Sequence, residues 1–273
     1  MGLIGGSLGL ALKKNFRGIE VVGVVHQKKN IHLVLSKKAA DFATLNLEEG
    51  IQGAKWIILA TPPLTFETIL KKLSSLCDSN QIIMDVGSVK GPVMESYRRH
   101  LKKRIPYLGA HPITGSEEKG IGAAQEDLFQ GATCILTPDQ NTSSKTLKEA
   151  KQFWKTLHAL PVVKSAALHD QIFAYVSHLP HLISFGLAYA LQGKQNFIPL
   201  SGQAWQDMTR IAHSSPLLWT EILTLNRQNV YESLRRFLQG LKKMEKDLQK
   251  NRPESIKKFF SHAQQILKDG NLL

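Results

Sequence analysis

The sequence predicts an α/β domain with a doubly wound sheet, followed by a domain built only from helices. In the first 165 residues, short apolar runs alternate with helical stretches, which is the pattern of a parallel sheet covered by helices on both faces. A glycine-rich turn opens the first of these helices. After Ser165 the strand pattern ends and long helical periods follow. We therefore predict one domain over residues 1–166 and a second over residues 167–273.

The individual elements follow from the same patterns. Six apolar runs have the length and composition of buried strands, at residues 20–25, 56–60, 82–86, 106–110, 133–136 and 161–164. Helices of the second domain are expected at residues 170–191, 217–250 and 253–268. The last of them opens with Pro253, and proline suits the first turn of a helix because the amide there needs no partner.

The composition limits the class of protein and the kind of partner. Hydrophobic residues make up 42% of the 273, enough for a sizeable core without disulfides or a structural metal. The formal charge of +13 excludes an acidic, disordered chain. It favours a polyanionic partner, which could be nucleic acid, an anionic membrane, or small molecules that carry phosphate and carboxylate groups.

The sequence also bears on the compartment. The chain has two cysteines, Cys77 and Cys134, without Cys-x-x-Cys spacing, so we expect reduced thiols in a cytoplasmic protein. No apolar run reaches the ~18 residues of a membrane span. The N-terminal pattern fits neither a signal peptide nor a myristoylation signal.

The N-terminus carries part of a phosphate-binding motif. The residues from Gly2 to Ser7, Gly-Leu-Ile-Gly-Gly-Ser, lead straight into a helical pattern. They match the last four residues of G-x-G-x-x-G, the turn that begins a Rossmann-type domain. Glycine is needed there because backbone N–H groups must come close to a pyrophosphate at a helix N-terminus. Candidate cofactor contacts are therefore Gly2, Leu3, Ile4 and Gly5, with a flexible glycine-rich start as the alternative.

The residues after the first predicted strand bear on the choice of cofactor. In an NAD site, an acid about 20 residues after the glycines binds the ribose hydroxyls. This chain has His26, Gln27, Lys28 and Lys29 there, within a segment of seven Lys or Arg and one Glu at residues 13–38. Hydrogen-bond donors and positive charge at these positions, in place of an acid, favour binding of the 2′-phosphate of NADP. We therefore predict NADP as the preferred cofactor, with NAD as the alternative.

Two other strand ends point to the same cofactor. Thr61 and Pro62 follow the predicted strand at residues 56–60, and Ser88 follows the one at residues 82–86. Because ligands of open α/β sheets bind outside the carboxyl ends of the strands, these residues are expected to contact the cofactor. The alternative role for Thr61 and Ser88 is that of helix caps.

Histidines and an arginine supply candidates for the chemistry. His111 ends a predicted strand beside the expected dinucleotide and is the candidate general base. His178 and His181 are three residues apart on a helix, but the sequence places no suitable third ligand, so we expect no metal. Arg210 could bind a carboxylate through two nitrogens, with a surface ion pair as the alternative.

Six motifs, in this order, resemble those of the prephenate/arogenate dehydrogenase family of tyrosine biosynthesis. They are Gly2-Leu-Ile-Gly-Gly-Ser, Asp85-x-Gly-Ser-Val-Lys, Gly109-x-His-Pro-Ile-x-Gly, His169-Asp170, Ser177-His-Leu-Pro-His and Asp207-x-Thr-Arg. The resemblance covers the chain from Gly2 to about Asn226. It implies a dinucleotide-binding domain followed by a helical dimerisation domain, and hence a homodimer.

The resemblance also implies roles for single residues. His111 matches the catalytic histidine that binds and deprotonates the ring hydroxyl of the substrate. Ser88 matches the serine between that hydroxyl and the nicotinamide, and Arg210 matches the arginine that binds the side-chain carboxylate. Further matches lie in the wall and near the entrance of the substrate pocket: His178, His181, Trp219, Ser116, Glu117 and Asp207.

The implied reaction is the oxidative decarboxylation of prephenate to 4-hydroxyphenylpyruvate, or of arogenate to tyrosine. Residues 202–206 lack the glycine-rich, Phe-containing form of the family, which leaves the choice between the two substrates open. A dianionic substrate and a polyphosphate cofactor are sufficient to explain the basic composition. We therefore expect neither nucleic acid nor a membrane as a partner.

Two alternative functions would have other sequence or binding properties. A dehydrogenase of the β-hydroxyacid type would carry Lys-x-x-x-Asn on the first helix of its second domain, and residues 170–191 contain no such pair. A non-catalytic protein that binds anions or nucleic acid on the same scaffold would show salt-dependent binding without turnover.

The glycine motif begins at its second glycine, so the first strand of the predicted fold has no residues to form it. In this fold that strand lies in the middle of the sheet, between two neighbours. We therefore predict an open slot beside the strand that ends at Val25, and a natural start about ten residues upstream of Met1. The alternative is a natural start at Met1 with another segment in the slot.

Overall fold

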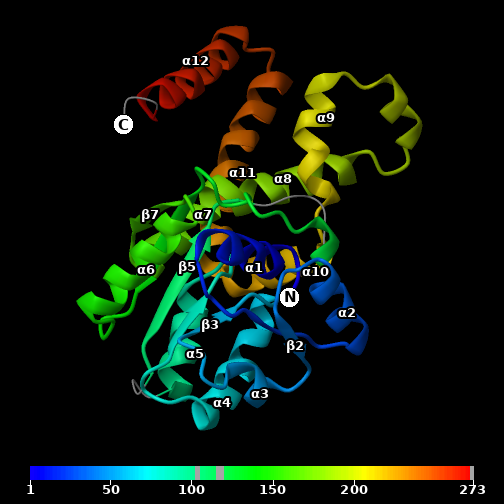
Figure 1. Cartoon of the computed structure of the whole chain (residues 1–273). Coiled ribbons are helices and arrows are strands. Elements are labelled where there is room, and N and C mark those ends of the chain that lie inside the picture. Colours follow the sequence, from blue (N-terminus) through cyan, green and yellow to red (C-terminus); the bar gives the residue numbers. More distant parts are fainter. Residues whose placement is uncertain (102–104, 115–119, 271–273) are drawn as a thin grey trace. The chain divides into compact units, whose positions relative to one another are not determined.

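The computed structural model describes residues 1–101, 105–114 and 120–270. The chain forms two compact units, Met1–Asn226 and Arg227–Leu273. The first unit contains the described strands (Figure 1). Its sheet-containing part comprises α1 (Leu3–Asn15), β1 (Val22–Val24), α2 (Lys28–Ser36), β2 (Phe42–Thr44), α3 (Leu47–Ile51), β3 (Trp56–Leu59), α4 (Phe66–Leu76), β4 (Ile82–Asp85), α5 (Gly91–Leu101), β5 (Tyr107–Pro112), β6 (Thr133–Pro138), α6 (Ser144–Thr156) and β7 (Leu160–Val163).

As far as residue 270, where the described part of the chain ends, only helical elements follow β7. The first unit continues with α7 (Ala166–Phe173), α8 (Leu179–Ala190), α9 (Gln203–Thr209) and α10 (Pro216–Leu225), and the second unit consists of α11 (Arg227–Gln249) and α12 (Pro253–Gly270). The change from strands to helices after β7 agrees with the predicted pattern. The two compact units, however, divide at Asn226. The predicted domain boundary at residue 166 stays a prediction.

Helices cover both faces of the main sheet. One apolar cluster contains Leu8 of α1, Trp154 of α6 and Met84 of β4. A second cluster contains Leu70 of α4 and Ile83 of β4. Met84 and Ile83 are consecutive, and consecutive side chains of a strand point to opposite faces. The sheet therefore lies between two helical layers, which confirms the predicted doubly wound α/β fold.

One strand pairing differs from the prediction of a parallel sheet. β3, β4 and β5 are parallel, as are β6 and β7, but β5 and β6 pair in antiparallel fashion. A parallel return needs a long crossover, usually a helix. In the described part of the connection between β5 and β6, the regular structure is one short 3₁₀ turn, Ile121–Ala123. Without a crossover helix, the chain returns beside β5 in the opposite direction.

The sheet is divided beside β1, where the sequence predicts a slot. β1 pairs with β2 alone, and β3 to β7 form a separate five-stranded sheet. Met1 contacts β1: its ammonium nitrogen lies 3.4 Å from the carbonyl oxygen of Val24. A Cβ atom added to Gly23 would lie 2.7 Å from Sδ of Met1. Among the described residues, no strand joins β1 to the five-stranded sheet.

Helix α1 packs unusually close to its neighbours because of its glycines. A Cβ atom added to Gly9 would lie 1.9 Å from the carbonyl oxygen of Ala39, which is backbone and cannot move aside. A Cβ atom added to Gly6 would lie 2.3 Å from Cδ1 of Ile121. Glycine costs helix propensity, and here tertiary packing outweighs that cost. The glycine-rich residues that follow Gly2 therefore form the first turns of α1, which begins at Leu3.

The predicted helix at residues 217–250 is in fact two helices. α10 ends at Leu225, and Asn226 has φ −101° and ψ 24°, outside the α-helical range. The side chain of Asn226 donates to the carbonyl oxygen of Asp170 at 2.8 Å. That contact lies far away in the sequence, so the helical period of the segment does not reveal the break.

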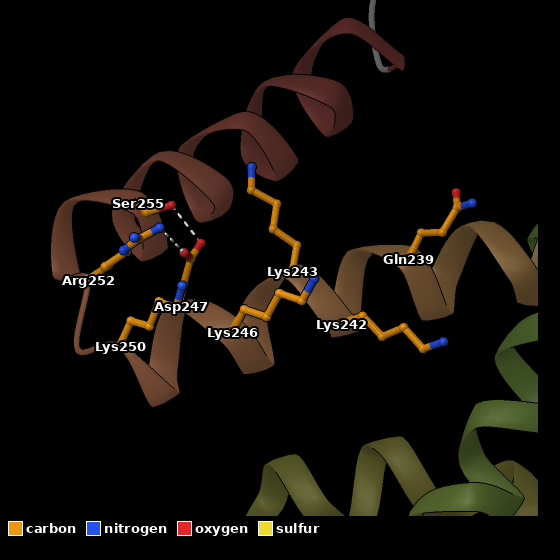
Figure 2. A pocket seen from close by; sticks show the side chains of 8 residues that line it. All are labelled: Gln239, Lys242, Lys243, Lys246, Asp247, Lys250, Arg252 and Ser255. Atoms are coloured by element: carbon orange, nitrogen blue, oxygen red, sulfur yellow. Dashed lines mark hydrogen bonds and ion pairs between the residues drawn. The ribbon is translucent and has the colours of Figure 1, made fainter.

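The second unit is a helical hairpin. Its turn is closed by Asp247, whose carboxylate accepts a hydrogen bond from Ser255 at 2.6 Å. Figure 2 shows a hollow at this turn, lined by Gln239, Lys242, Lys243, Lys246, Asp247, Lys250, Arg252 and Ser255. None of the predicted site residues lines it. In the described part of the chain, no helix has the length and apolar character needed to cross a bilayer.

Candidate active site

Two histidines and a carboxylate lie in a row at the carboxyl end of β5. His111 is near the end of β5, and His169 and Asp170 are neighbours in α7. Nδ1 of His111 lies 2.8 Å from Nε2 of His169, and Nδ1 of His169 lies 2.7 Å from Oδ1 of Asp170. Phe173 packs against both imidazole rings, with centroid distances of 4.6 Å and 4.5 Å. The candidate base is therefore one member of a hydrogen-bonded line of three side chains.

The carboxylate of Asp170 is held by the start of α5. The backbone N–H groups of Lys90 and Gly91 donate to its two oxygens, each at 2.8 Å. Both amides belong to the N-terminal end of a helix, where backbone groups favour an anion. A Cβ atom added to Gly91 would lie 2.9 Å from Oδ2 of Asp170. Glycine at this position therefore allows the carboxylate to approach.

The side chain of Lys90 stabilises the same region through buried polar contacts. It is fully buried and forms an ion pair with Asp85, which is also fully buried. Its Nζ atom also donates to the carbonyl oxygen of Ala110 at 2.7 Å. Asp85 in turn accepts hydrogen bonds from the hydroxyl group of Tyr107 and from the amide of Gly87. Lys90 thus links the residue before His111 to the turn that binds Asp170.

His178, His181 and Trp219 form a second group, linked to the first by Asn226. The ring of His181 stacks on Trp219 with a centroid distance of 3.6 Å. Nδ2 of Asn226 donates to the Asp170 carbonyl and lies 3.1 Å from Nδ1 of His178. Because Nδ2 is a donor, Nδ1 of His178 accepts and Nε2 carries the proton. That buried Nε2 atom has no hydrogen-bond partner among the described residues.

The histidines of both groups are held in the neutral state. Burial lowers the pKa of His111 well below 6.5, and the positive charge of Lys90 lowers it further. Burial also lowers the pKa of His178 to about 4. The pKa values of His169 and His181 are lowered as well, again mainly by burial. At pH 7 His111 is therefore an uncharged imidazole, the form that can accept a proton.

A π-helical turn places the two pocket histidines. Residues Ala174–His178 form this turn between α7 and α8, and Pro180 follows at the start of α8. Proline has no N–H to donate to the preceding turn, which favours a wider turn at this point. Nδ1 of His181 then bonds the carbonyl oxygen of Ser177 at 2.9 Å, which orients its ring against Trp219.

The N-terminus of α1 fits the phosphates of a dinucleotide. Among the described residues, no side chain caps its first amides, because the N-cap residue is Gly2. A Cβ atom added to Gly2 would meet no atom within 4 Å, so the approach to these amides is open. Gly5 is close to the end of β3, since its added Cβ would lie 3.2 Å from that of Ala60. Together with Leu3 and Ile4, these glycines have the features of a pyrophosphate-binding turn.

The other candidate cofactor contacts follow neighbouring strands. β3, β4 and β5 are parallel, so their carboxyl ends share one edge of the sheet. Thr61 and Pro62 after β3 are exposed, and Ser88 after β4 is half-buried. This edge also carries His111. The residues that follow β1, His26, Gln27, Lys28 and Lys29, are all exposed.

The remaining candidates are less closely tied to this network. Arg210 begins a short 3₁₀ helix, Arg210–His213, which packs against α8, the helix that carries His181. Asp207 accepts a hydrogen bond from Gln203 at 2.8 Å. Ser116 and Glu117 lie outside the described residues. In the described part of the chain, no group of three His, Cys, Asp or Glu residues could hold a metal ion.

Sequence reasoning did not assign roles to several residues that build the site. Lys90, Asp85, His169 and Asp170 occur in the quoted motifs, and Asn226 does not. A signal was available for one pair: an adjacent His and Asp at the start of a predicted helix can form a carboxylate–imidazole contact. The contact to His111 spans 58 residues of sequence, so only the structure reveals it.

Comparisons with known proteins identify the family of the chain. The family model described as the nucleotide-binding domain of prephenate dehydrogenase matches residues 8–163, and that of its dimerisation domain matches residues 165–262. The prephenate dehydrogenase of Bacillus subtilis is 30% identical over 275 residues, covering 99% of this chain and 74% of that protein.

Solved structures give the same result. The prephenate dehydrogenase of A. aeolicus, in complex with hydroxyphenyl propionate and NAD+, has a TM-score of 0.89 at 28% identity, over 100% of this chain and 96% of that one. Synechocystis arogenate dehydrogenase has a TM-score of 0.81 at 28% identity, over 99% and 96% of the two chains. The β-hydroxyacid-type and non-catalytic alternatives are not favoured. The chain belongs to the prephenate dehydrogenase family.

Proposed function

We propose that this protein oxidises and decarboxylates prephenate or arogenate, with a nicotinamide dinucleotide as the oxidant. Prephenate would yield 4-hydroxyphenylpyruvate and carbon dioxide, and arogenate would yield tyrosine and carbon dioxide. The single observation that carries the proposal is a neutral His111, oriented by His169 at the edge of the sheet where parallel strands end. Ligands of such sheets bind at this edge.

His111 acts as the general base in this proposal. Its Nε2 atom takes the proton of the ring hydroxyl while the carbinol carbon loses a hydride to the oxidant and becomes a carbonyl. The bond between the ring and its carboxylate then breaks and carbon dioxide leaves. The electron pair of that bond completes the aromatic ring, and the carbonyl oxygen becomes the phenolic oxygen, which takes up a proton. Aromatisation makes this sequence strongly downhill, so the protein mainly has to position the substrate and accept one proton.

The cofactor would be held by the turn at the start of α1. Gly2, Leu3, Ile4 and Gly5 would bind the pyrophosphate through backbone N–H groups, and Thr61 and Pro62 would border it. Ser88 would lie between the cofactor and the substrate hydroxyl. When bound, the nicotinamide ring would supply the two-electron acceptor of the reaction.

The substrate's carboxylates need cationic or donor groups. Arg210 would bind the side-chain carboxylate, because its planar guanidinium can donate two parallel hydrogen bonds. The unpartnered Nε2–H of His178 is a donor available to the substrate, and His181 with Trp219 would form the wall beside it. Ser116 and Glu117 stay candidates for the pocket entrance.

Reduced nicotinamide, followed at 340 nm, tests the proposal. The purified protein would be assayed with prephenate and with arogenate, each with NAD and with NADP. We expect turnover of at least one substrate, with one carbon dioxide released per reduced cofactor. Absence of turnover in all four combinations, with a folded protein that binds the dinucleotide, would contradict the proposed function.

NADP is the expected preferred cofactor. The exposed segment after β1 offers His26, Gln27, Lys28 and Lys29, which have no acid to repel a 2′-phosphate. We expect kcat/KM to be higher with NADP than with NAD, and His26→Asp to shift the ratio towards NAD. His32→Asp, in the middle of α2, is the matched control and should leave the ratio unchanged. A higher kcat/KM with NAD in the unchanged protein would refute the preference.

A homodimer built mainly by the helical region is also proposed. The matched dimerisation domain covers residues 165–262. The hairpin of the second unit exposes several large apolar side chains, a pattern typical of an interface. They are Leu238, Leu241, Leu248, Phe260, Ile266 and Leu267. Light scattering at micromolar concentration should give twice the mass of 30.4 kDa, and Phe260→Glu should weaken the dimer. A monomeric unchanged protein would count against it.

We further propose that the protein works in the cytoplasm. Both cysteines, Cys77 and Cys134, are free rather than disulfide-bonded. Burial raises the pKa of Cys77 to about 11 and raises that of Cys134 as well. Both groups are therefore protonated thiols at neutral pH and have a structural role in the core.

A further inference from the structure

His111, His169 and Asp170 form a hydrogen-bonded line of side chains, and this line has a fixed hydrogen-bond direction. The line ends in Asp170, which is buried and accepts hydrogen bonds from three N–H groups. Two come from the backbone of Lys90 and Gly91 at 2.8 Å, and the third comes from Nδ1 of His169 at 2.7 Å. A carboxylate can only accept hydrogen bonds. This end of the line therefore fixes the direction of every hydrogen bond in it.

The direction propagates through both imidazole rings. Because Asp170 accepts, Nδ1 of His169 carries the proton, and in a neutral ring Nε2 then has the lone pair. That lone pair faces Nδ1 of His111 at 2.8 Å, so Nδ1 of His111 must carry a proton in turn. The one ring nitrogen of His111 that is left with a lone pair is Nε2.

We propose that His169 and Asp170 are positioning residues that hold His111 in the tautomer with a bare Nε2. This inference rests on the proposed role of His111 as the base that accepts the substrate's hydroxyl proton. In the other tautomer Nε2 would carry a proton and could not accept one. Asp170 acts through His169, and neither residue needs to touch the substrate.

The surroundings keep this line from rearranging. The ring of His169 stacks on Phe173 with an interplanar angle of 19°. The carbonyl oxygen of Asp170 accepts a hydrogen bond from Asn226 at 2.8 Å. Lys90 holds the carbonyl oxygen of Ala110 as well as the carboxylate of Asp170, so β5 and α7 are tied to the same residue. His111 and Asp170 are therefore held by elements that share Lys90 as a common partner.

The same line of side chains also stabilises His111 after it has accepted the substrate's proton. His111 then becomes an imidazolium, and its Nδ1–H bond to His169 strengthens because the donor is charged. The negative charge of Asp170 stabilises that positive charge through the intervening ring. A carboxylate that orients an imidazole and stabilises the imidazolium has the same two effects in serine proteases.

Asp170→Asn is the decisive variant. An asparagine side chain has one acceptor oxygen and one NH₂ group. Oδ1 of Asp170 accepts from the Lys90 amide and from Nδ1 of His169, and Oδ2 accepts from the Gly91 amide. When the asparagine oxygen stays with the Gly91 amide, the NH₂ group replaces Oδ1 and faces Nδ1 of His169, which must then accept, so its proton moves to Nε2. His111 is then forced to accept at Nδ1 and to carry its proton at Nε2. We expect kcat to fall on the order of 10²–10⁴-fold, with the dissociation constant of the dinucleotide nearly unchanged.

The tautomer can be measured without substrate. Long-range ¹H–¹⁵N NMR spectra of protein labelled in its histidine rings distinguish a protonated from a bare ring nitrogen. The His111 signals are identified by their absence from His111→Gln. We expect Nδ1–H and bare Nε2 in the unchanged protein, and the reverse in Asp170→Asn.

Two variants of His169 separate positioning from packing. His169→Gln can present its amide oxygen to Nδ1 of His111, whereas His169→Phe keeps the stack on Phe173 but offers no acceptor. We expect His169→Gln to retain at least tenfold more kcat than His169→Phe. Asp139→Asn is the matched control, because Asp139 is a buried carboxylate that binds Arg98. It should leave kcat and the His111 tautomer unchanged.

The outcomes distinguish this inference from the function on which it rests. A large loss of kcat in Asp170→Asn with an unchanged His111 tautomer, or equal kcat values for the two His169 variants, overturns the inference even if the protein turns over prephenate. A protein without any turnover contradicts the proposed function. Spectra that already show Nε2–H in the unchanged protein overturn the tautomer assignment.

Discussion

Replacing His111 with asparagine is expected to lower kcat on the order of 10²–10⁴-fold. The base accepts a proton that leaves in the transition state, so its loss affects the chemical step rather than binding. The dissociation constant of the dinucleotide should stay nearly unchanged, since its phosphates would lie at α1. Single-turnover kinetics with saturating substrate and cofactor measures this directly. A variant with an unchanged kcat would exclude His111 as the base.

The pH dependence gives a second test of the same residue. Burial, together with the positive charge of Lys90, lowers the pKa of His111 well below 6.5. His111 is active when neutral, so activity is lost only as pH falls through this lowered pKa. The acid limb of kcat/KM should therefore lie below pH 6.5. His158→Asn is a suitable control, because His158 has φ +59°, a conformation that asparagine tolerates, and lies outside the site network.

Lys90→Met is expected to cost about 3–5 kcal/mol of the free energy of unfolding. Lys90 and Asp85 are both fully buried, and the substitution leaves the carboxylate of Asp85 without its cation. Burying a charge without a partner costs far more free energy than burying an apolar side chain of similar volume. The carbonyl oxygen of Ala110 loses its donor as well. Denaturant unfolding followed by circular dichroism measures the loss.

A control variant and a double variant test whether the loss comes from the buried ion pair. Lys55→Met removes a cation from an ion pair with Glu149, but the Lys55 side chain is 63% exposed, so the cost should stay below about 1 kcal/mol. The double variant Asp85→Asn with Lys90→Met removes both charges and should recover part of the stability. If Lys90→Met cost no more than Lys55→Met, the buried pair would not have the proposed structural role.

Local patterns in the sequence are enough to predict the architecture of the fold. The apolar run at residues 82–86 predicts β4, Ile82–Asp85, because a strand buried on both faces is mostly apolar. Other features are not predicted, among them β2 and the break at Asn226. β2 has only three residues, Phe42–Thr44, which is too short for a period to be recognised. The break at Asn226 depends on a side-chain hydrogen bond to Asp170, which no local pattern encodes.

Part of the candidate site could also be predicted from the sequence, and part could not. The strand ends at Ser88 and His111 could be predicted, because parallel strands bring their carboxyl ends to one edge. The support for His111 could not be predicted, since Lys90 and Asp170 are 80 residues apart in the sequence. Which nitrogen of a histidine carries the proton depends on the partner of the other nitrogen, and that partner comes from another element.

The sequence by itself determined the alternation of strands and helices, the glycine-rich turn, the change to helices after Ser165, and the motifs that resemble one family. These properties depend on neighbouring residues, so they can be recognised along the chain. Only the tertiary structure decided that β6 runs antiparallel to β5 and that His111, His169 and Asp170 form one line. Such contacts join distant segments, and they depend on how whole elements pack rather than on any local period.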